Sequence, residues 1–140
     1  MAEFAWNSRK AFRLIFQSDA SFRLHRAFKK NIHFKEKTIS SKLIDLSTGG
    51  CSLESPYPIP TGVKLNVFLD RNFLKTPSEK SRKREISRIV VVVRAARQLS
   101  IRKYRLGVQF EKLSSEDLRL IREFIERNDR REGKRIAFPT

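Results

Sequence analysis

Apolar and polar residues alternate in short runs between residues 31 and 110, and this alternation limits the fold more than any other feature. A period of two is that of a β-strand with one buried face. The clearest run places Val63, Leu65, Val67 and Leu69 on one face. Glycine, proline and serine separate the runs, as expected for turns. The pattern predicts six strands, at about residues 31–35, 42–46, 51–55, 63–69, 86–98 and 104–110.

Helical periodicity occurs at both ends of the chain. Phe12, Ile15 and Phe16 have the i, i+3, i+4 spacing of one helix face, which predicts a short basic helix at residues 11–16. Ser114 is a capping residue for a second helix, whose apolar stripe consists of Leu118, Ile121, Phe124 and Ile125. Residues 71–85 are polar and basic, which predicts an exposed loop or a mobile hairpin tip.

Short antiparallel strands followed by one amphipathic helix indicate a mainly β fold. We expect a six-stranded antiparallel β-barrel, a C-terminal α-helix that covers its end or side, and a short N-terminal basic helix or arm. The chain has 140 residues, which suits one core rather than two. We expect the arm at residues 1–20, the barrel with its closing helix at 21–130 and a basic tail at 131–140.

Positive charge dominates the composition. Lys and Arg number 31 against 15 Asp and Glu, a formal net charge of +16. Such a charge favours an anionic partner, which could be nucleic acid, a phosphorylated ligand, an acidic protein or a membrane surface. An ordinary soluble but basic surface is the alternative. Because the chain shows neither a secretory leader nor an apolar run of the roughly 18–20 residues that a membrane span needs, we predict a cytoplasmic protein.

Catalysis and metal binding have little support in the sequence. His25 lies in a basic run and His33 on the polar face of its predicted strand, so neither has a clear nucleophilic partner. Cys51 falls on the predicted buried face, which indicates a small core residue rather than a nucleophile. One cysteine and two histidines are too few for a typical zinc site. We therefore predict a binding module with neither enzymatic activity nor a cofactor.

One motif of the form D-x-S-x-x-G lies between the second and third predicted strands. Its residues are Asp45, Ser47 and Gly50. A carboxylate offers two acceptors, for a guanine N–H edge or an arginine, and a serine hydroxyl both donates and accepts. Glycine lets a bulky group approach the backbone. The alternative is a plain hairpin turn in which Asp45 and Ser47 cap backbone amides.

This motif and its context resemble the PilZ family, whose members are small six-stranded barrels that bind the bacterial second messenger cyclic di-GMP. The resemblance covers about residues 21–127. Its parts are the arginine-containing segment at 22–26, the D-x-S-x-x-G motif, the proline-glycine segment at 59–65, and the Gly-Val-Gln-Phe strand within 104–110 that a helix follows.

The resemblance also implies an R-x-x-x-R motif before the first strand, whose arginines hold phosphates and stack on guanines. If Arg26 is the second arginine, Phe22 occupies the first position and Arg23 is its neighbour. Arg9 and Arg13 match the motif literally but lie further from Asp45. The shorter spacing predicts a ligand site on Arg23, Arg26, Asp45, Ser47 and Gly50, with Arg9 and Arg13 as the second choice.

The resemblance implies a non-enzymatic receptor whose ligand is cyclic di-GMP. Ligand binding would order the arginine segment and change the surface offered to a protein partner. We expect no specific nucleic-acid binding and no membrane span. The alternatives are a ligand-independent PilZ-like adaptor that docks an acidic protein through its basic face, and a nucleic-acid binder.

Overall fold

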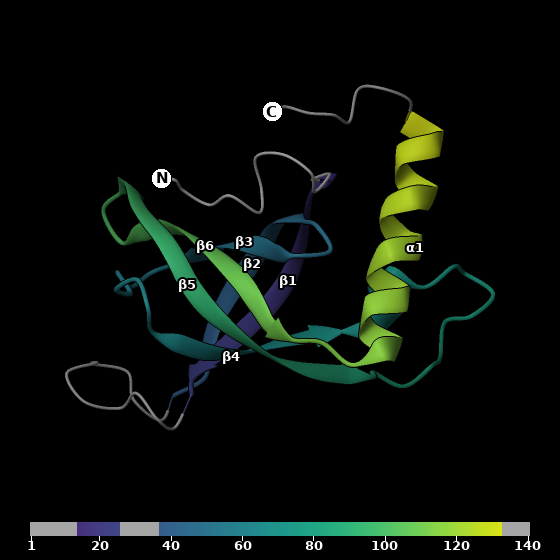
Figure 1. Ribbon diagram of the computed structural model, residues 1–140, viewed down its shortest axis with the longest axis horizontal. Coiled ribbons are helices and arrows are strands. Elements are labelled where there is room, and N and C mark those ends of the chain that lie inside the picture. The colour runs from purple at the N-terminus through teal and green to yellow at the C-terminus, as the bar shows by residue number, and fades with distance from the viewer. Residues whose placement is uncertain (1–13, 26–36, 133–140) are drawn as a thin grey trace.

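The computed structural model describes residues 14–25 and 37–132. Six strands in this part of the chain pair antiparallel in a closed barrel of order β1-β2-β3-β6-β5-β4, and a C-terminal helix packs against it (Figure 1). The strands are β1 (Leu14–Leu24), β2 (Ile39–Leu46), β3 (Gly50–Ser55), β4 (Lys64–Asp70), β5 (Ile86–Ser100) and β6 (Lys103–Lys112); the helix is α1 (Ser115–Glu132). The predicted mainly β barrel with a C-terminal helix is confirmed.

The barrel interior is filled from the apolar side of each strand. In β4, Leu65, Val67 and Leu69 are at most 2% exposed, whereas Asn66 and Phe68 between them are only half-buried. Each fully buried side chain of this size contributes about 1.5–3 kcal/mol to folding relative to an exposed one. Other interior side chains are Phe22, Leu43, Leu53, Val91, Val93, Leu106 and Val108.

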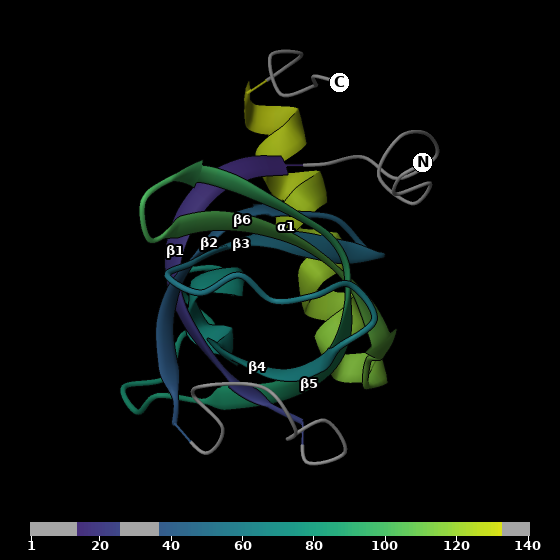
Figure 2. The same ribbon diagram turned by 90° about the vertical axis from the view of Figure 1, so that its left-hand side faces the viewer.

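The two ends of the barrel differ in what covers them. We call one the helix end: it carries the first residues of β1, β3 and β5 and the last residues of β2, β4 and β6, and α1 lies across it behind the barrel in Figure 2. Leu120, Ile121 and Ile125 of α1 belong to the core. The opposite end carries the β5–β6 turn, and we call it the hairpin end.

A buried polar network attaches α1 to the barrel. It involves η3, a 3₁₀ turn (Arg71–Leu74) after β4. Arg71 Nε donates to Ser87 Oγ at 2.6 Å and to Asp117 Oδ1 at 3.0 Å, and Ser87 Oγ donates to Asp117 Oδ1 at 2.7 Å. Ser114 Oγ accepts from Asp117 N at 3.0 Å, as expected of a helix-capping serine. The start of α1 is therefore fixed to both η3 and β5.

The first strand differs from the prediction. The helix predicted at residues 11–16 is wrong from residue 14 onward, because β1 begins at Leu14 and pairs with β2 and β4. The barrel thus starts inside the range predicted for the N-terminal arm. The strand predicted at 31–35 and residues 11–13 lie outside the described residues. Alternation of Ala20, Phe22 and Leu24 was the signal for β1, since these three pack in or against the core.

The remaining predicted elements are confirmed. The strands predicted from residue 42 to residue 110 correspond to β2 through β6, and the helix predicted after Ser114 is α1. The segment predicted as a loop at residues 71–85 begins with η3, whose Leu74 is buried, and continues through exposed residues 77–84.

Candidate functional site

The D-x-S-x-x-G motif forms the tight turn between β2 and β3 at the helix end. Ser47 is fully buried, and its Oγ accepts from Gly49 N at 3.1 Å and Gly50 N at 3.2 Å and donates to Gly50 O at 3.3 Å. Phe110 N on β6 donates to Gly49 O at 2.9 Å. The serine hydroxyl is thus used within the turn, and β6 holds the turn against the barrel.

Asp45 lies on the outer face of the barrel although it is only 4% exposed. A β-bulge in β2 separates the register pairs Leu43–Leu53 and Asp45–Ser52. Leu43 and Leu53 are interior residues, so Asp45 and Ser52 face outward. The bulge therefore directs a carboxylate to the outer face directly beside the Ser47 turn.

Small residues continue from Asp45 across the neighbouring strands. Asp45 pairs with Ser52 on β3, Ser52 pairs with Gly107 on β6, and Gly107 pairs with Ala95 on β5. The row is a floor of small side chains with little exposed surface, since Ser52 is 4% exposed and Gly107 is buried, so a planar group could stack on it only when it is uncovered. Sequence reasoning missed the floor, because only the strand register brings these residues together.

The next outer row on β5 and β6 is basic. Arg97 pairs directly with Arg105 across the two strands, and two like charges at this distance repel each other. Arg97 is exposed and Arg105 half-buried. An anion placed near them would relieve the repulsion, so the floor is bordered by a pair of cations that sequence reasoning also missed.

Arg23 lies far from the motif. Asp45 pairs with Ile15 near the start of β1, whereas Arg23 pairs with Asn66 close to the end of the same strand. Eight residues of strand separate the two positions on β1, on the order of 25 Å. The structure therefore does not bring Arg23 to Asp45, Ser47 and Gly50.

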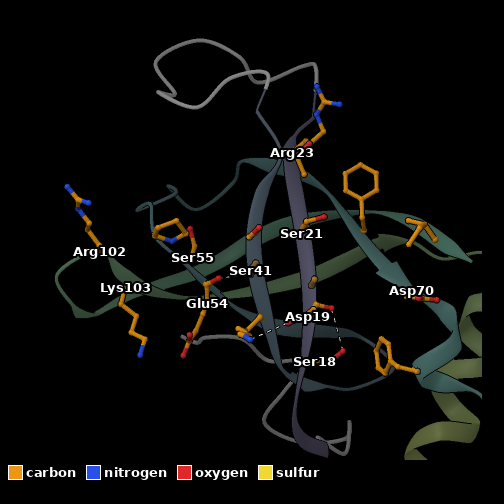
Figure 3. Close-up of a pocket in the computed structure, with 18 of the residues that line it drawn as sticks. Ser18, Asp19, Ser21, Arg23, Ser41, Glu54, Ser55, Asp70, Arg102 and Lys103 are labelled. Carbon is orange, nitrogen blue, oxygen red and sulfur yellow. Dashed lines mark hydrogen bonds and ion pairs between the residues drawn. The ribbon is translucent and has the colours of Figure 1, made fainter. Parts of the chain in front are cut away.

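Arg23 is exposed and borders a groove of about 1360 Å³ that runs along β1 and β2. In Figure 3, Asp19, Ser21 and Arg23 follow one another along β1, and Arg102 and Lys103 lie on the other side of the groove. None of the three motif residues lines this groove. Arg9, Arg13 and Arg26 lie outside the described residues.

The described part of the chain also contains Cys51 and His25, whose side-chain types can be reactive in other proteins. Cys51 is fully buried in the core, and burial raises the pKa of its thiol well above the ordinary value, with the neighbouring Asp45 carboxylate raising it further. His25 donates its backbone N–H to Lys64 O at 3.0 Å. Within residues 14–25 and 37–132, no cluster of three or more His, Cys, Asp or Glu could hold a metal ion.

Comparison with known families agrees with the geometry. The sequence model of the PilZ domain matches residues 7–127. The chain belongs to the PilZ domain family. The match begins before Arg9, so it includes the R-x-x-x-R of Arg9 and Arg13 as well as the D-x-S-x-x-G turn. No curated protein matches the chain.

Solved structures share the fold at low sequence identity. The PilZ domain of YcgR from Escherichia coli, solved with cyclic di-GMP, has a TM-score of 0.60 at 15% identity, over 93% of this chain and 100% of that one. The MrkH–cyclic di-GMP complex of K. pneumonia has a TM-score of 0.61 at 14% identity, over 92% and 55%. The motility inhibitor MotI of Bacillus subtilis has a TM-score of 0.59 at 14% identity, over 87% and 52%.

This chain therefore spans about half the length of MotI and of MrkH. In the described part of the PilZ chain, no helix is both long and apolar enough to cross a membrane.

Proposed function

We propose that this PilZ domain is a receptor for cyclic di-GMP without catalytic activity of its own. The observation that carries the proposal is the D-x-S-x-x-G turn, held by the hydrogen bonds of Ser47 at the helix end of a PilZ barrel with the Asp45 carboxylate on the outer face. The ligand would lie over the floor of Ser52 and Gly107, with Asp45 accepting hydrogen bonds from a guanine edge.

The strand register supports Arg9 and Arg13 as the arginine pair. Leu14 pairs with Leu46, so the chain enters β1 beside the motif, and Arg13 immediately precedes Leu14. Arg23 lies near the opposite end of β1, and Arg26 follows the end of that strand in sequence. The proposed site therefore combines Arg9 and Arg13 with Asp45, Ser47 and Gly50 in place of Arg23 and Arg26.

Arginines suit the two phosphates of the ligand because a guanidinium is always charged, is planar and donates in a fork geometry. Arg97 and Arg105 add positive charge at the border of the floor. Repulsion between them favours an anion in this position.

Signalling would follow from ordering of the arginine segment on the ligand. A ligand shifts a conformational equilibrium only through a difference in its affinity for the two states. Contacts from Arg9 and Arg13 to a ligand held by Asp45 supply such a difference. The ordered segment and ligand would then form a surface for a protein partner.

The second candidate is a PilZ adaptor that docks a protein without a ligand. The hydrogen bonds of Ser47 favour it, because they all lie within the turn and would give the motif a purely structural role.

Titration calorimetry with cyclic di-GMP, and with GMP as the control, distinguishes the two candidates. The receptor proposal predicts saturable heat with cyclic di-GMP and much weaker binding of GMP, since two guanines and two phosphates are held together. Absence of heat at high cyclic di-GMP concentration would reject the receptor and support the adaptor.

A further inference from the structure

The β5–β6 hairpin extends beyond the part of the barrel where β4 covers β5. β4 pairs with β5 from Asp70–Ile86 to Lys64–Val92, and Gly62 and Val63 then bond to Val93. Gly62 has a φ of 91°, a left-handed turn conformation that glycine adopts without strain. β5 continues for seven more residues, 94–100, past this turn.

In the described part of the chain, only one edge of this extension is paired with another strand. β6 pairs with it as far as Ser100–Lys103. Within the described residues, no strand pairs with the other edge of residues 94–100. All of these residues except the half-buried Ala95 are exposed. An uncovered strand edge presents unpaired backbone N–H and C=O groups, which an extended segment can pair with.

The side chains around this edge indicate the kind of partner that would fit it. Residues 94–105 contain no acidic residue, and their basic residues are Arg94, Arg97, Arg102, Lys103 and Arg105. Leu99 is 42% exposed and Ile101 at the turn is 84% exposed. The tip points away from α1, so this helix does not cover it (Figure 1).

We propose that the edge of β5 at residues 94–100 is a docking site for an acidic, extended segment of a protein partner, which adds as a strand beside β5. A second copy of this chain fits poorly, because antiparallel self-pairing would bring arginines of the two copies together. Acidic side chains would instead pair with Arg94 and Arg97, while apolar ones cover Leu99 and Ile101. This site goes beyond the cyclic di-GMP proposal and does not depend on it, although Ala95 belongs to the proposed ligand floor and Arg97 borders it.

A capped peptide of alternating valine and glutamate, matched in length to the edge, is the probe. The measurement combines NMR titration of the full chain with amide hydrogen exchange, without cyclic di-GMP. The expected result is saturable binding that slows exchange within residues 94–100. A peptide N-methylated along one edge, and one with lysine for glutamate, should both fail to bind.

Two variants test the role of charge. Arg97→Glu should weaken the peptide about tenfold at low salt. Arg122→Glu makes the same change on an exposed face of α1 and should leave binding unchanged. Equal binding of the N-methylated peptide would overturn the proposal, since strand addition needs its N–H groups, and so would absence of binding.

Two further results would reassign the edge. Self-association in sedimentation velocity, accompanied by slower amide exchange within residues 94–100 in the absence of peptide, would assign the edge to a second copy. The protein could instead bind phosphatidylglycerol vesicles and lose this binding on Ile101→Ser, while the peptide leaves amide exchange within residues 94–100 unchanged. This result would assign the tip to an anionic membrane. Either result overturns the proposal.

Discussion

At the scale of single residues, Asp45 and Ser47 occupy one motif but have different surroundings. Ser47 is fully engaged in turn hydrogen bonds, whereas Asp45 lies on the outer face beside a floor of small residues. In the proposed receptor, Ser47 therefore stabilises the turn, and Asp45 would recognise the ligand.

Replacing Asp45 tests this division. Asp45→Ala should weaken cyclic di-GMP by about tenfold to a hundredfold, because a hydrogen bond to a charged group contributes about 1.5–3 kcal/mol. Calorimetry measures the affinity, and a thermal melt checks that the barrel is folded. Asp19→Ala is the matched control, since Asp19 is an exposed carboxylate that pairs with Lys42 away from the motif. Equal affinity of both variants and the parent would contradict the assignment.

Phe22 shows where family spacing and packing disagree. The resemblance aligned this position with an arginine, but the side chain is fully buried in the barrel core. Phe22→Arg should therefore destabilise the fold by more than about 3 kcal/mol without improving ligand affinity. Urea denaturation measures the loss. Phe68→Arg, on the outer side of β4, is the control and should lower the free energy of unfolding much less. A Phe22→Arg variant with full stability and higher ligand affinity would refute this interpretation.

At the scale of elements, local patterns predicted β2 to β6 and α1 well. Each has apolar alternation, a run of β-branched residues or a helical stripe, bounded by turn residues, so neighbouring residues carry the signal. β1 was missed because its first residues have helical spacing, and the polar residues 17–19 separate them from the short alternation of Ala20, Phe22 and Leu24. Pairing with β2 and β4 joins both parts into one strand, and these pairing partners lie far apart in sequence.

The misplaced first strand also explains why the sequence favoured Arg23 and Arg26 over Arg9 and Arg13. With the first strand expected at residues 31–35, Arg23 and Arg26 preceded it. With β1 starting at Leu14, Arg9 and Arg13 precede it. The basic pair Arg97 and Arg105 was equally inaccessible, since a β-bulge between Val93 and Ala95 sets its register.

The attachment of α1 can be tested through Asp117. Asp117→Ala removes the acceptor shared by Arg71 and Ser87 and should lower the free energy of unfolding by about 1–3 kcal/mol. Urea denaturation followed by circular dichroism measures this loss. Glu116→Ala changes the adjacent, exposed residue, whose ion pair with Arg119 lies on the surface, and should cost much less stability than Asp117→Ala. Similar losses for both variants would show that the buried network does not hold the helix.

At the scale of the whole molecule, a net charge of +16 attracts any polyanion. We expect duplex DNA to bind weakly and with a steep salt dependence, because the attraction arises from counterion release. Fluorescence anisotropy across a salt series measures the slope. Sequence-selective binding that persists at physiological salt would instead favour the nucleic-acid alternative.

The most direct test of the receptor proposal compares arginines in the full chain. Calorimetric titration with cyclic di-GMP should show saturable binding in the parent protein. Arg13→Ala should weaken it about tenfold or more, because one charge-assisted contact to a phosphate is lost, whereas Arg23→Ala should leave it unchanged. Absence of binding in the parent protein, or a loss on Arg23→Ala with none on Arg13→Ala, would contradict the proposal.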